Sequence, residues 1–299
     1  MSEEIITFGK TRTLVGILHT PVGDVPRADL PAVLLLNAGL LHRVGPNRLY
    51  VKIARQLERS GFHVLRFDVW GIGDSHDHAG ETKGTFVDDT LEAFEVLNQR
   101  LGATRFMLMG ICMGAQIALE VASRDLRVES LALMEGIYVK SARYHLSRIL
   151  SPRKWKRVFT GESQMVKRLR KKLLLKHSGN NSDNRQPATE SKGSHTSNGN
   201  ITLFLDENRD KNMKEKLGAL LERGTKIILI FRNGNEIAYN YRLRKAGDEI
   251  FAVGLPRGLD VVFVRFADHT FTPLLSQDLL LKAIMRWIEA LGLRECARA

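Results

Sequence analysis

Apolar and polar residues follow a repeating order along this chain, in which a strand-like block is followed by a helix-like block. Short continuous apolar runs indicate strands covered on both faces, and the longer segments carry apolar residues at helical spacing. Strands are predicted at 4–9, 12–20, 32–36, 63–67, 106–109, 130–134, 225–231 and 260–265. Helices are predicted at 47–60, 85–100, 115–122, 209–222 and 274–291. This alternation predicts an α/β fold, with a mostly parallel sheet of about eight strands flanked by helices.

One long segment, residues 137–222, interrupts the alternation. Its first part, 139–176, holds 13 Lys and Arg residues with Glu162 as the only acid, and its apolar residues recur at helical spacing. This pattern predicts a basic helical cap inserted into the fold. Residues 178–200 have scarcely an apolar side chain to offset the entropy of ordering and are predicted to be disordered. We therefore expect a core built from 1–136 and 223–299, with the cap at 137–222.

The charge of the chain is concentrated in that cap. The formal net charge is +12, and the basic segment alone accounts for a balance of that size. Nucleic acid is not the expected partner, because a nucleic-acid-binding domain usually spreads its basic face over the fold. The segment is interpreted in two ways: as solvated lid helices, or as a surface that docks on an anionic membrane or an anionic glycan. It could equally attract an acidic substrate.

The location of the protein is predicted from what the sequence does not contain. Residues 1–5 lack the basic and apolar pattern of a signal peptide, and no run approaches the roughly 18 apolar residues of a membrane span. The two cysteines, Cys112 and Cys296, form neither a disulfide framework nor a metal-spacing cluster. We expect a cytoplasmic protein, with peripheral binding to the inner membrane face as an option, and neither a metal nor a cofactor.

The strongest chemical signal is the stretch 107–115, Met-Leu-Met-Gly-Ile-Cys-Met-Gly-Ala. An apolar run ends at Gly110, Cys112 follows, and a helical pattern starts after Gly114. A nucleophile between two glycines at a strand-to-helix turn is the nucleophile elbow of the α/β-hydrolase fold. The alternative is a turn of small residues with a buried thiol, and the motif alone does not separate the two.

The whole chain except the cap resembles the α/β-hydrolase superfamily. It is closest to the exosortase-A-system-associated hydrolases, a group related to the serine-aminopeptidase-like proteins. That resemblance rests on residues 41–50 (LHRVGPNRLY), 65–75 (LRFDVWGIGDS) and 268–273 (DHTFTP). The group usually has Gly-Leu-Cys-Ser-Gly-Ala at the elbow, and this chain keeps the cysteine in Gly-Ile-Cys-Met-Gly-Ala. The resemblance implies a hydrolase, in some members near exopolysaccharide or lipid biosynthesis, and it supplies no substrate.

The expected partners of Cys112 follow from the chain order of this fold, which is nucleophile, acid and then histidine. His269 lies just after the last strand and is the predicted base. For the residue that orients His269, Asn235 and Glu236 after the strand 225–231 are favoured over Glu135, which ends the preceding strand. An Asn can orient an imidazole paired with a thiol, as in papain-like sites. Asp268 is predicted to have a structural role.

The remaining predictions concern the chemistry. The backbone N–H groups of Leu40 and Met113 are the expected oxyanion hole. Cys112 would attack a small acyl substrate, an ester or a thioester, and His269 would protonate the leaving group before water releases the acid. A carboxylesterase or thioesterase is thus predicted. The alternatives are an acyltransferase that uses the same site and a non-catalytic scaffold that binds an anionic lipid or polysaccharide surface.

Overall fold

A computed structural model of the chain describes residues 2–10, 12–21, 29–77, 85–137, 209–232 and 257–293. All of them belong to one compact unit, formed by Met1–Val139 and Ser197–Ala299. The predicted basic cap segment at 139–176 and the predicted disorder at 178–200 lie outside the described residues, so both stay predictions.

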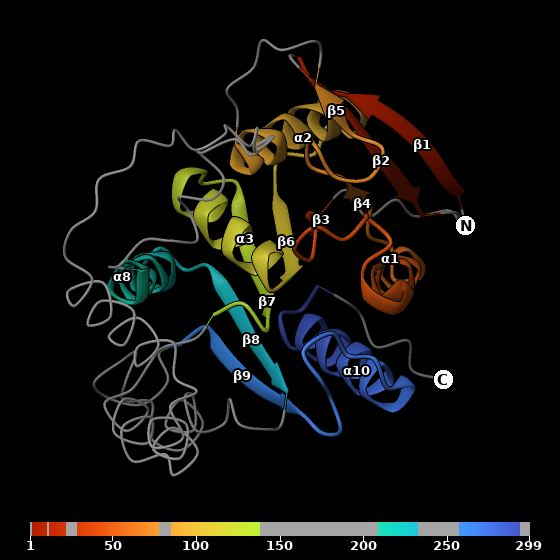
Figure 1. The fold of residues 1–299 in the computed structure, drawn as a ribbon. Helices are drawn as coiled ribbons and strands as arrows, with labels where there is room; N and C mark the ends of the chain where they lie inside the picture. The colour runs from red at the N-terminus through yellow and green to blue at the C-terminus, as the bar shows by residue number, and fades with distance from the viewer. Residues whose placement is uncertain are drawn as a thin grey trace, which may run out of the picture. The chain divides into compact units, whose positions relative to one another are not determined.

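A central sheet organises the unit (Figure 1), with strands in the order β1-β2-β4-β3-β6-β7-β8-β9. The strands are β1 (Ser2–Phe8), β2 (Arg12–Thr20), β3 (Ala32–Leu36), β4 (Val64–Phe67), β5 (His76–Asp77), β6 (Phe106–Ile111), β7 (Val128–Met134), β8 (Lys226–Arg232) and β9 (Leu259–Val264). β2 pairs antiparallel with β1, β4 and β5, and the pairs from β4 to β9 are parallel. This confirms the predicted fold class.

Helices cover both faces of the sheet (Figure 1). They are the 3₁₀ turn Pro46–Arg48, α1 (Leu49–Arg59), α2 (Phe86–Leu101), α3 (Met113–Arg124), α8 (Arg209–Glu222) and α10 (Leu274–Ala290). The buried residues of α2, α3 and α8 pack together on one face, and those of α1 and α10 pack on the other. Strands β3, β4 and β6 are buried at every position, which explains why they read as continuous apolar runs.

Local sequence explains where several elements begin and end. Thr85 and Asp88 form a reciprocal capping box at the start of α2, with the Asp88 amide 3.3 Å from the Thr85 hydroxyl. The predicted strand 106–109 continues to Ile111, because Gly110 keeps the extended conformation. β5 is not among the strands that the sequence predicts. His76 and Asp77 pair with Thr13 and Arg12, although the His76 side chain is exposed.

The parallel pairing determines where chemistry can occur. Because β3, β6, β7, β8 and β9 run in the same direction, their carboxyl ends meet at one edge of the sheet, where α/β folds bind ligands. The loops that follow these strands carry the residues that the sequence singles out. None of the helices in the described ranges is long and apolar enough to cross a membrane.

Candidate active site

Cys112 lies at a sharp turn between β6 and α3. Its backbone has φ 55° and ψ −111°, a conformation that L-residues rarely adopt, and α3 begins at the next residue, Met113. The Cys112 amide donates to the Met134 carbonyl at 2.8 Å, which ties the turn to the end of β7. A strained residue at the apex of a strand-to-helix turn is the geometry that the elbow motif predicts.

The turn is packed so closely that its flanking residue must be glycine. A Cβ at Gly114 would lie 2.4 Å from the Leu36 carbonyl oxygen and 2.8 Å from that of Asn37. Both contacts are with backbone, which cannot swing away as a side chain can. The first turn of α3 therefore packs directly against the end of β3, where the predicted oxyanion loop begins.

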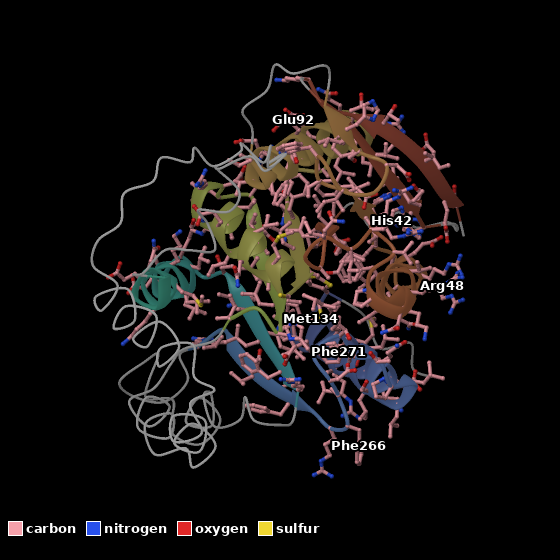
Figure 2. The ribbon with its side chains drawn as sticks, viewed as in Figure 1. His42, Arg48, Glu92, Met134, Phe266 and Phe271 are labelled. Atoms are coloured by element: carbon pink, nitrogen blue, oxygen red, sulfur yellow. The ribbon has the colours of Figure 1, made fainter. Side chains whose placement is uncertain are left out.

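His269 comes from the loop between β9 and α10. Asp268 accepts hydrogen bonds from the amides of Thr272 at 2.8 Å and Thr270 at 3.2 Å, so it fixes this loop, as the predicted structural role requires. Phe271 is fully buried and has a φ of 53°. Figure 2 shows Phe271 near Met134, and both belong to the same buried cluster. The loop is thus anchored on both sides of the histidine.

Glu135 is the carboxylate that meets this histidine in the described part of the chain. Its Oε2 lies 3.2 Å from His269 Nδ1, and its side chain is fully buried. Oε1 accepts the Arg232 amide at 2.5 Å, and the Arg232 Nε lies 3.7 Å from Oε2. Glu135 has a φ of 51°, so it is a second non-glycine residue in the left-handed region at this edge. Such strain persists where the surroundings fix it, and it clusters at functional sites.

The backbone after Glu135 is also adapted to the elbow. A Cβ at Gly136 would lie 2.4 Å from the Cys112 carbonyl oxygen and 2.4 Å from the Ala115 side chain. The Glu135 amide donates to Ile230 at 3.0 Å. The corner that carries Glu135 is therefore fixed against the elbow on one side and against β8 on the other.

His269 is hydrogen-bonded to Cys112 as well as to Glu135. These two bonds, in that order of importance, raise the pKa of His269 to about 9. Since Nδ1 faces Glu135, Nε2 is the ring nitrogen left to meet the Cys112 sulfur. At neutral pH the arrangement favours an imidazolium between a carboxylate and the thiol, and an imidazolium stabilises a neighbouring thiolate. Thiol, imidazole and carboxylate in series are the arrangement of nucleophilic acyl-transfer sites.

The loop after β3 and the start of α3 each carry one of the two predicted oxyanion donors. Leu41 donates to Ala38 in a tight turn with Gly39 at φ 65°, and the Leu40 amide is not used by that turn bond. Met113 is the first residue of α3, and the first amides of a helix have no intrahelical acceptor. Both groups are thus suited to bind an anionic oxygen, and their role stays a prediction.

A buried hydrogen-bond network holds this loop in place. Asn37 donates from Nδ2 to Asp68 Oδ1 at 3.0 Å and to the Leu41 carbonyl at 2.9 Å, and its Oδ1 accepts the Val69 amide at 2.9 Å. Asp68 Oδ1 also accepts the Arg43 amide at 2.5 Å. Asn37 and Asp68 are fully buried, so the network joins the loops after β3 and β4 rigidly.

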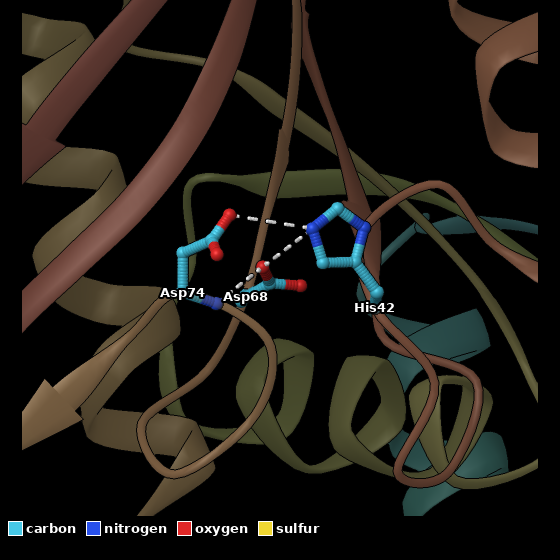
Figure 3. A group of neighbouring side chains, drawn as sticks. All are labelled: His42, Asp68 and Asp74. Atoms are coloured by element: carbon cyan, nitrogen blue, oxygen red, sulfur yellow. Dashed lines mark hydrogen bonds and ion pairs between the residues drawn. The ribbon is translucent and has the colours of Figure 1, made fainter.

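Three side chains of these loops could offer ligands to a metal (Figure 3). His42 Nε2 lies 3.4 Å from Asp74 Oδ2 and 3.6 Å from Asp68 Oδ2, and all three ligand atoms lie within 4.8 Å of one another. Arg43 already pairs with both carboxylates, through Nη1 to Asp68 and through Nη2 to Asp74 at 2.7 Å. Hydrogen bonds from Arg43 and then His42 lower the pKa of Asp74. A metal ion would compete with this guanidinium, so the donor set fits a charge-paired cluster better than a metal centre.

Residues 31–198, more than half of the chain, match the model of the alpha/beta hydrolase fold. The chain belongs to the alpha/beta hydrolase fold family.

Two relatives of this hydrolase-fold chain share part of its sequence. It is 29% identical over 117 residues to esterase EstD of Thermotoga maritima, across 38% of this chain and 28% of that protein. It is 26% identical over 130 residues to the lysophosphatidylserine lipase ABHD12 of Xenopus tropicalis, across 41% of this chain and 33% of that protein. The matched part spans about a third of the length of these relatives.

Solved structures of the same fold cover nearly the whole chain. An esterase domain of a Rhodothermus marinus protein has a TM-score of 0.55 at 16% identity and covers 97% of this chain and 99% of that one. The haloalkane dehalogenase DatA of Agrobacterium tumefaciens also has a TM-score of 0.55, at 13% identity, with 97% of each chain covered. At such low identity these similarities show the fold alone.

The structure of this alpha/beta hydrolase brings some of the predicted site residues together and leaves others untested. Cys112 and His269 are hydrogen-bonded, and their catalytic roles stay predictions. Asn235 and Glu236 lie outside the described residues, so their predicted role is neither confirmed nor excluded. Glu135, the less favoured candidate of the sequence, is the one whose carboxylate lies 3.2 Å from His269 Nδ1.

Sequence reasoning missed three buried residues around the site. Asp68 and Arg43 lie within the stretches 65–75 and 41–50 that carry the family resemblance, and neither is among the predicted site residues. Arg43 is in fact 8% exposed and paired with Asp68. Tyr50 was missed because it lies at a core-facing position of a predicted helix. An invariant Arg–Asp pair or tyrosine in an alignment of relatives would be the signal that finds them.

Proposed function

We propose that this alpha/beta hydrolase cleaves an ester or thioester acyl bond with Cys112 as the nucleophile. The observation that carries the proposal is the bonding of His269 on both sides, to the Cys112 thiol and to the Glu135 carboxylate. In this assignment His269 carries the proton and Glu135 orients the ring. Asn235 and Glu236 stay the sequence-based alternatives for the orienting residue.

The reaction proceeds in two halves. The Cys112 thiolate attacks the carbonyl carbon, and the carbonyl electrons move to oxygen, which binds the amides of Leu40 and Met113. When the carbonyl re-forms, the bond to the leaving alcohol or thiol breaks, and His269 donates its proton to that group. Water then attacks the acyl-cysteine, His269 takes the proton of that water, and Cys112 leaves as a thiolate with release of the acid.

The substrate class follows from the nucleophile and the fold. A thiolate is itself a good leaving group, so the tetrahedral intermediate expels a poor leaving group such as an alkyl amine less readily than it expels Cys112. Activated acyl groups are therefore the expected substrates. Similarity to an esterase and to a lysophosphatidylserine lipase supports acyl esters as the class.

Two finer proposals rest on the sequence alone. The motifs at 41–50, 65–75 and 268–273 resemble the exosortase-associated hydrolases, which suggests a role near exopolysaccharide synthesis. The basic segment 139–176 suggests that the protein docks on an anionic membrane face or glycan. Sedimentation with anionic vesicles, compared with neutral ones and with a variant neutralised at its five basic residues within 167–172, tests the second proposal.

Acyl transfer to an alcohol is the alternative reaction of the same site, because an alcohol in place of water gives an ester instead of an acid. Product analysis with added glycerol separates the two. The other alternative, a non-catalytic scaffold, would be favoured if Asn235 were the residue that orients His269. The buried carboxylate at His269 supports catalysis instead.

The decisive experiment compares wild type with Cys112→Ala on p-nitrophenyl acetate and on a short acyl-CoA. Turnover should disappear in Cys112→Ala and persist in Cys296→Ala, the matched variant at the second cysteine. Iodoacetamide should label Cys112 first, as mass spectrometry of the digested protein would reveal. Full turnover by Cys112→Ala would refute the proposal.

A further inference from the structure

Tyr50, the second residue of α1, is fully buried below the active-site edge of the sheet. Its hydroxyl donates a hydrogen bond to the Leu36 carbonyl at 2.7 Å and accepts one from the Ile111 amide at 2.9 Å. Leu36 is the last residue of β3, and Ile111 is the last residue of β6. One side-chain oxygen therefore joins the ends of two neighbouring strands.

The hydroxyl lies at the last pair of the two strands. β3 and β6 are paired in parallel from Ala32 with Phe106 to Leu36 with Gly110. At that last pair, the Tyr50 hydroxyl bonds to both the Leu36 carbonyl and the Ile111 amide, as two hydrogen bonds in series. The hydroxyl thus adds two hydrogen bonds that tie the ends of the two strands to each other.

The Leu36 carbonyl and the Ile111 amide adjoin the two segments that carry the proposed catalytic groups. Leu36 is followed by the loop that ends with the Leu40 amide, and Ile111 is followed by Cys112 and the Met113 amide. The Tyr50 hydroxyl consequently sets the spacing between the two segments that carry the oxyanion donors. An error of about 1 Å in such spacing can cost about 100-fold in rate.

The environment of Tyr50 excludes an acid–base role and fixes its ring. Burial raises the pKa of the Tyr50 hydroxyl well above its usual value, and the nearby Cys112 adds to that shift. Its proton is used in the bond to Leu36. The Gly45 backbone packs on the ring, since a Cβ there would lie 2.6 Å from Tyr50 Cγ, and the Tyr50 amide donates to Val44 at 3.2 Å.

We propose that Tyr50 is a positioning residue for the oxyanion hole, which it sets by bridging the carboxyl ends of β3 and β6. This inference rests on the proposed function, because it needs an acyl substrate whose oxygen becomes negative. In this proposal Tyr50 controls the distance between the two donors, and His269 controls the ionisation of Cys112.

Two reactions of the same thiol separate these roles. Acylation of Cys112 by p-nitrophenyl acetate needs an oxyanion hole, whereas alkylation by iodoacetamide needs only a reactive thiolate. In Tyr50→Phe, which keeps the ring and loses both hydrogen bonds, the acylation rate should fall about 100-fold. The alkylation rate and its pH profile should stay within about twofold of wild type, because His269 and Glu135 are untouched.

Two further variants keep the test interpretable. Ser60→Ala removes a hydroxyl that donates to the Gln56 carbonyl at 3.1 Å on the same helix, and it should change neither rate. Gly45→Ala keeps the Tyr50 hydroxyl but presses on its ring, at a residue with φ 72°, and should also slow acylation selectively. Gly45→Ala replaces Tyr50→Phe if the latter does not fold, as judged by circular dichroism.

Each outcome has a distinct meaning. Equal losses of acylation and alkylation, or no loss of either, would overturn the positioning role of Tyr50. If wild type shows no acylation, or if Cys112→Ala is acylated at the wild-type rate, the proposed function fails instead. The proposed function and the positioning role of Tyr50 are both supported if Tyr50→Phe loses acylation selectively and Cys112→Ala reacts with neither reagent at this site.

Discussion

Glu135→Gln keeps the size of the side chain and removes the negative charge next to His269. In the wild type the carboxylate oxygen lies 3.2 Å from His269 Nδ1. Two unit charges at that distance attract each other by about 5 kcal/mol at an effective dielectric constant of about 20. Because 43% of the His269 side chain is exposed, solvent screening reduces this to about 2–3 kcal/mol. About 1.4 kcal/mol corresponds to a factor of ten, so kcat/KM should fall about 100-fold.

The pH profile of the same variant gives a second measurement. The neighbouring anions favour the imidazolium and raise the pKa of His269 to about 9. Removing one of them disfavours the imidazolium, so the pKa of His269 should fall. The alkaline limb of kcat/KM, where the imidazolium loses its proton, should therefore move to lower pH. Stopped-flow acylation by p-nitrophenyl acetate across that range measures both the rate and the shift.

Three other variants make the result specific to Glu135. Glu129→Gln is the matched control, since Glu129 is 41% exposed and pairs with Arg105 at the opposite edge of the sheet. Asn235→Ala and Glu236→Gln test the residues that the sequence favours. The reasoning fails if Glu135→Gln acylates like wild type with an unmoved alkaline limb, and a loss in Glu236→Gln or Asn235→Ala would then identify the orienting residue.

Two further predictions concern stability. Gly114→Ala should lower the free energy of unfolding by about 1–3 kcal/mol in urea, because its Cβ would lie 2.4 Å from the Leu36 carbonyl. Gly218→Ala on α8, with nothing within 4 Å, should raise it by up to about 1 kcal/mol, and equal shifts would contradict the packing argument. The pKa of His269, about 9 when folded, exceeds its unfolded value of about 6.5. His269 therefore contributes about 1 kcal/mol, after screening, to the free energy of unfolding. This contribution is complete below about pH 6.5 and is lost as the pH rises through about 9. His269→Gln should abolish this slope in urea midpoints, and an undiminished slope would assign it to another group.

Local signals explain which parts could be predicted. The apolar runs of β3 and β6 and the Gly-x-Cys-x-Gly turn are each contained in a few consecutive residues. His269 could be predicted because the fold fixes the place of this histidine after the last strand. These features depend on spacing along the chain, which the sequence displays directly.

The remaining features depend on contacts between distant residues. Glu135 follows directly after a strand, as many polar residues do, and only the approach of the loop that carries His269 brings it to its partner. Arg43 and Asp68 are 25 residues apart, and no periodicity links them. Tyr50 fits the apolar face of a helix by its ring, and its hydroxyl matters only because β3 and β6 end beside it.

The backbone hydrogen bond from Cys112 to Met134 has a consequence for local opening of the protein. It places the thiol and Glu135 in one supersecondary unit, β6–α3–β7, whereas His269 arrives from the β9–α10 loop. Proteins open in cooperative units that often coincide with such motifs. If the β9–α10 loop detaches first, the histidine is lost while thiol and carboxylate keep their places. Amide exchange near His269 would then precede exchange in β6 and β7, and mild denaturant would inactivate the protein reversibly before its core unfolds.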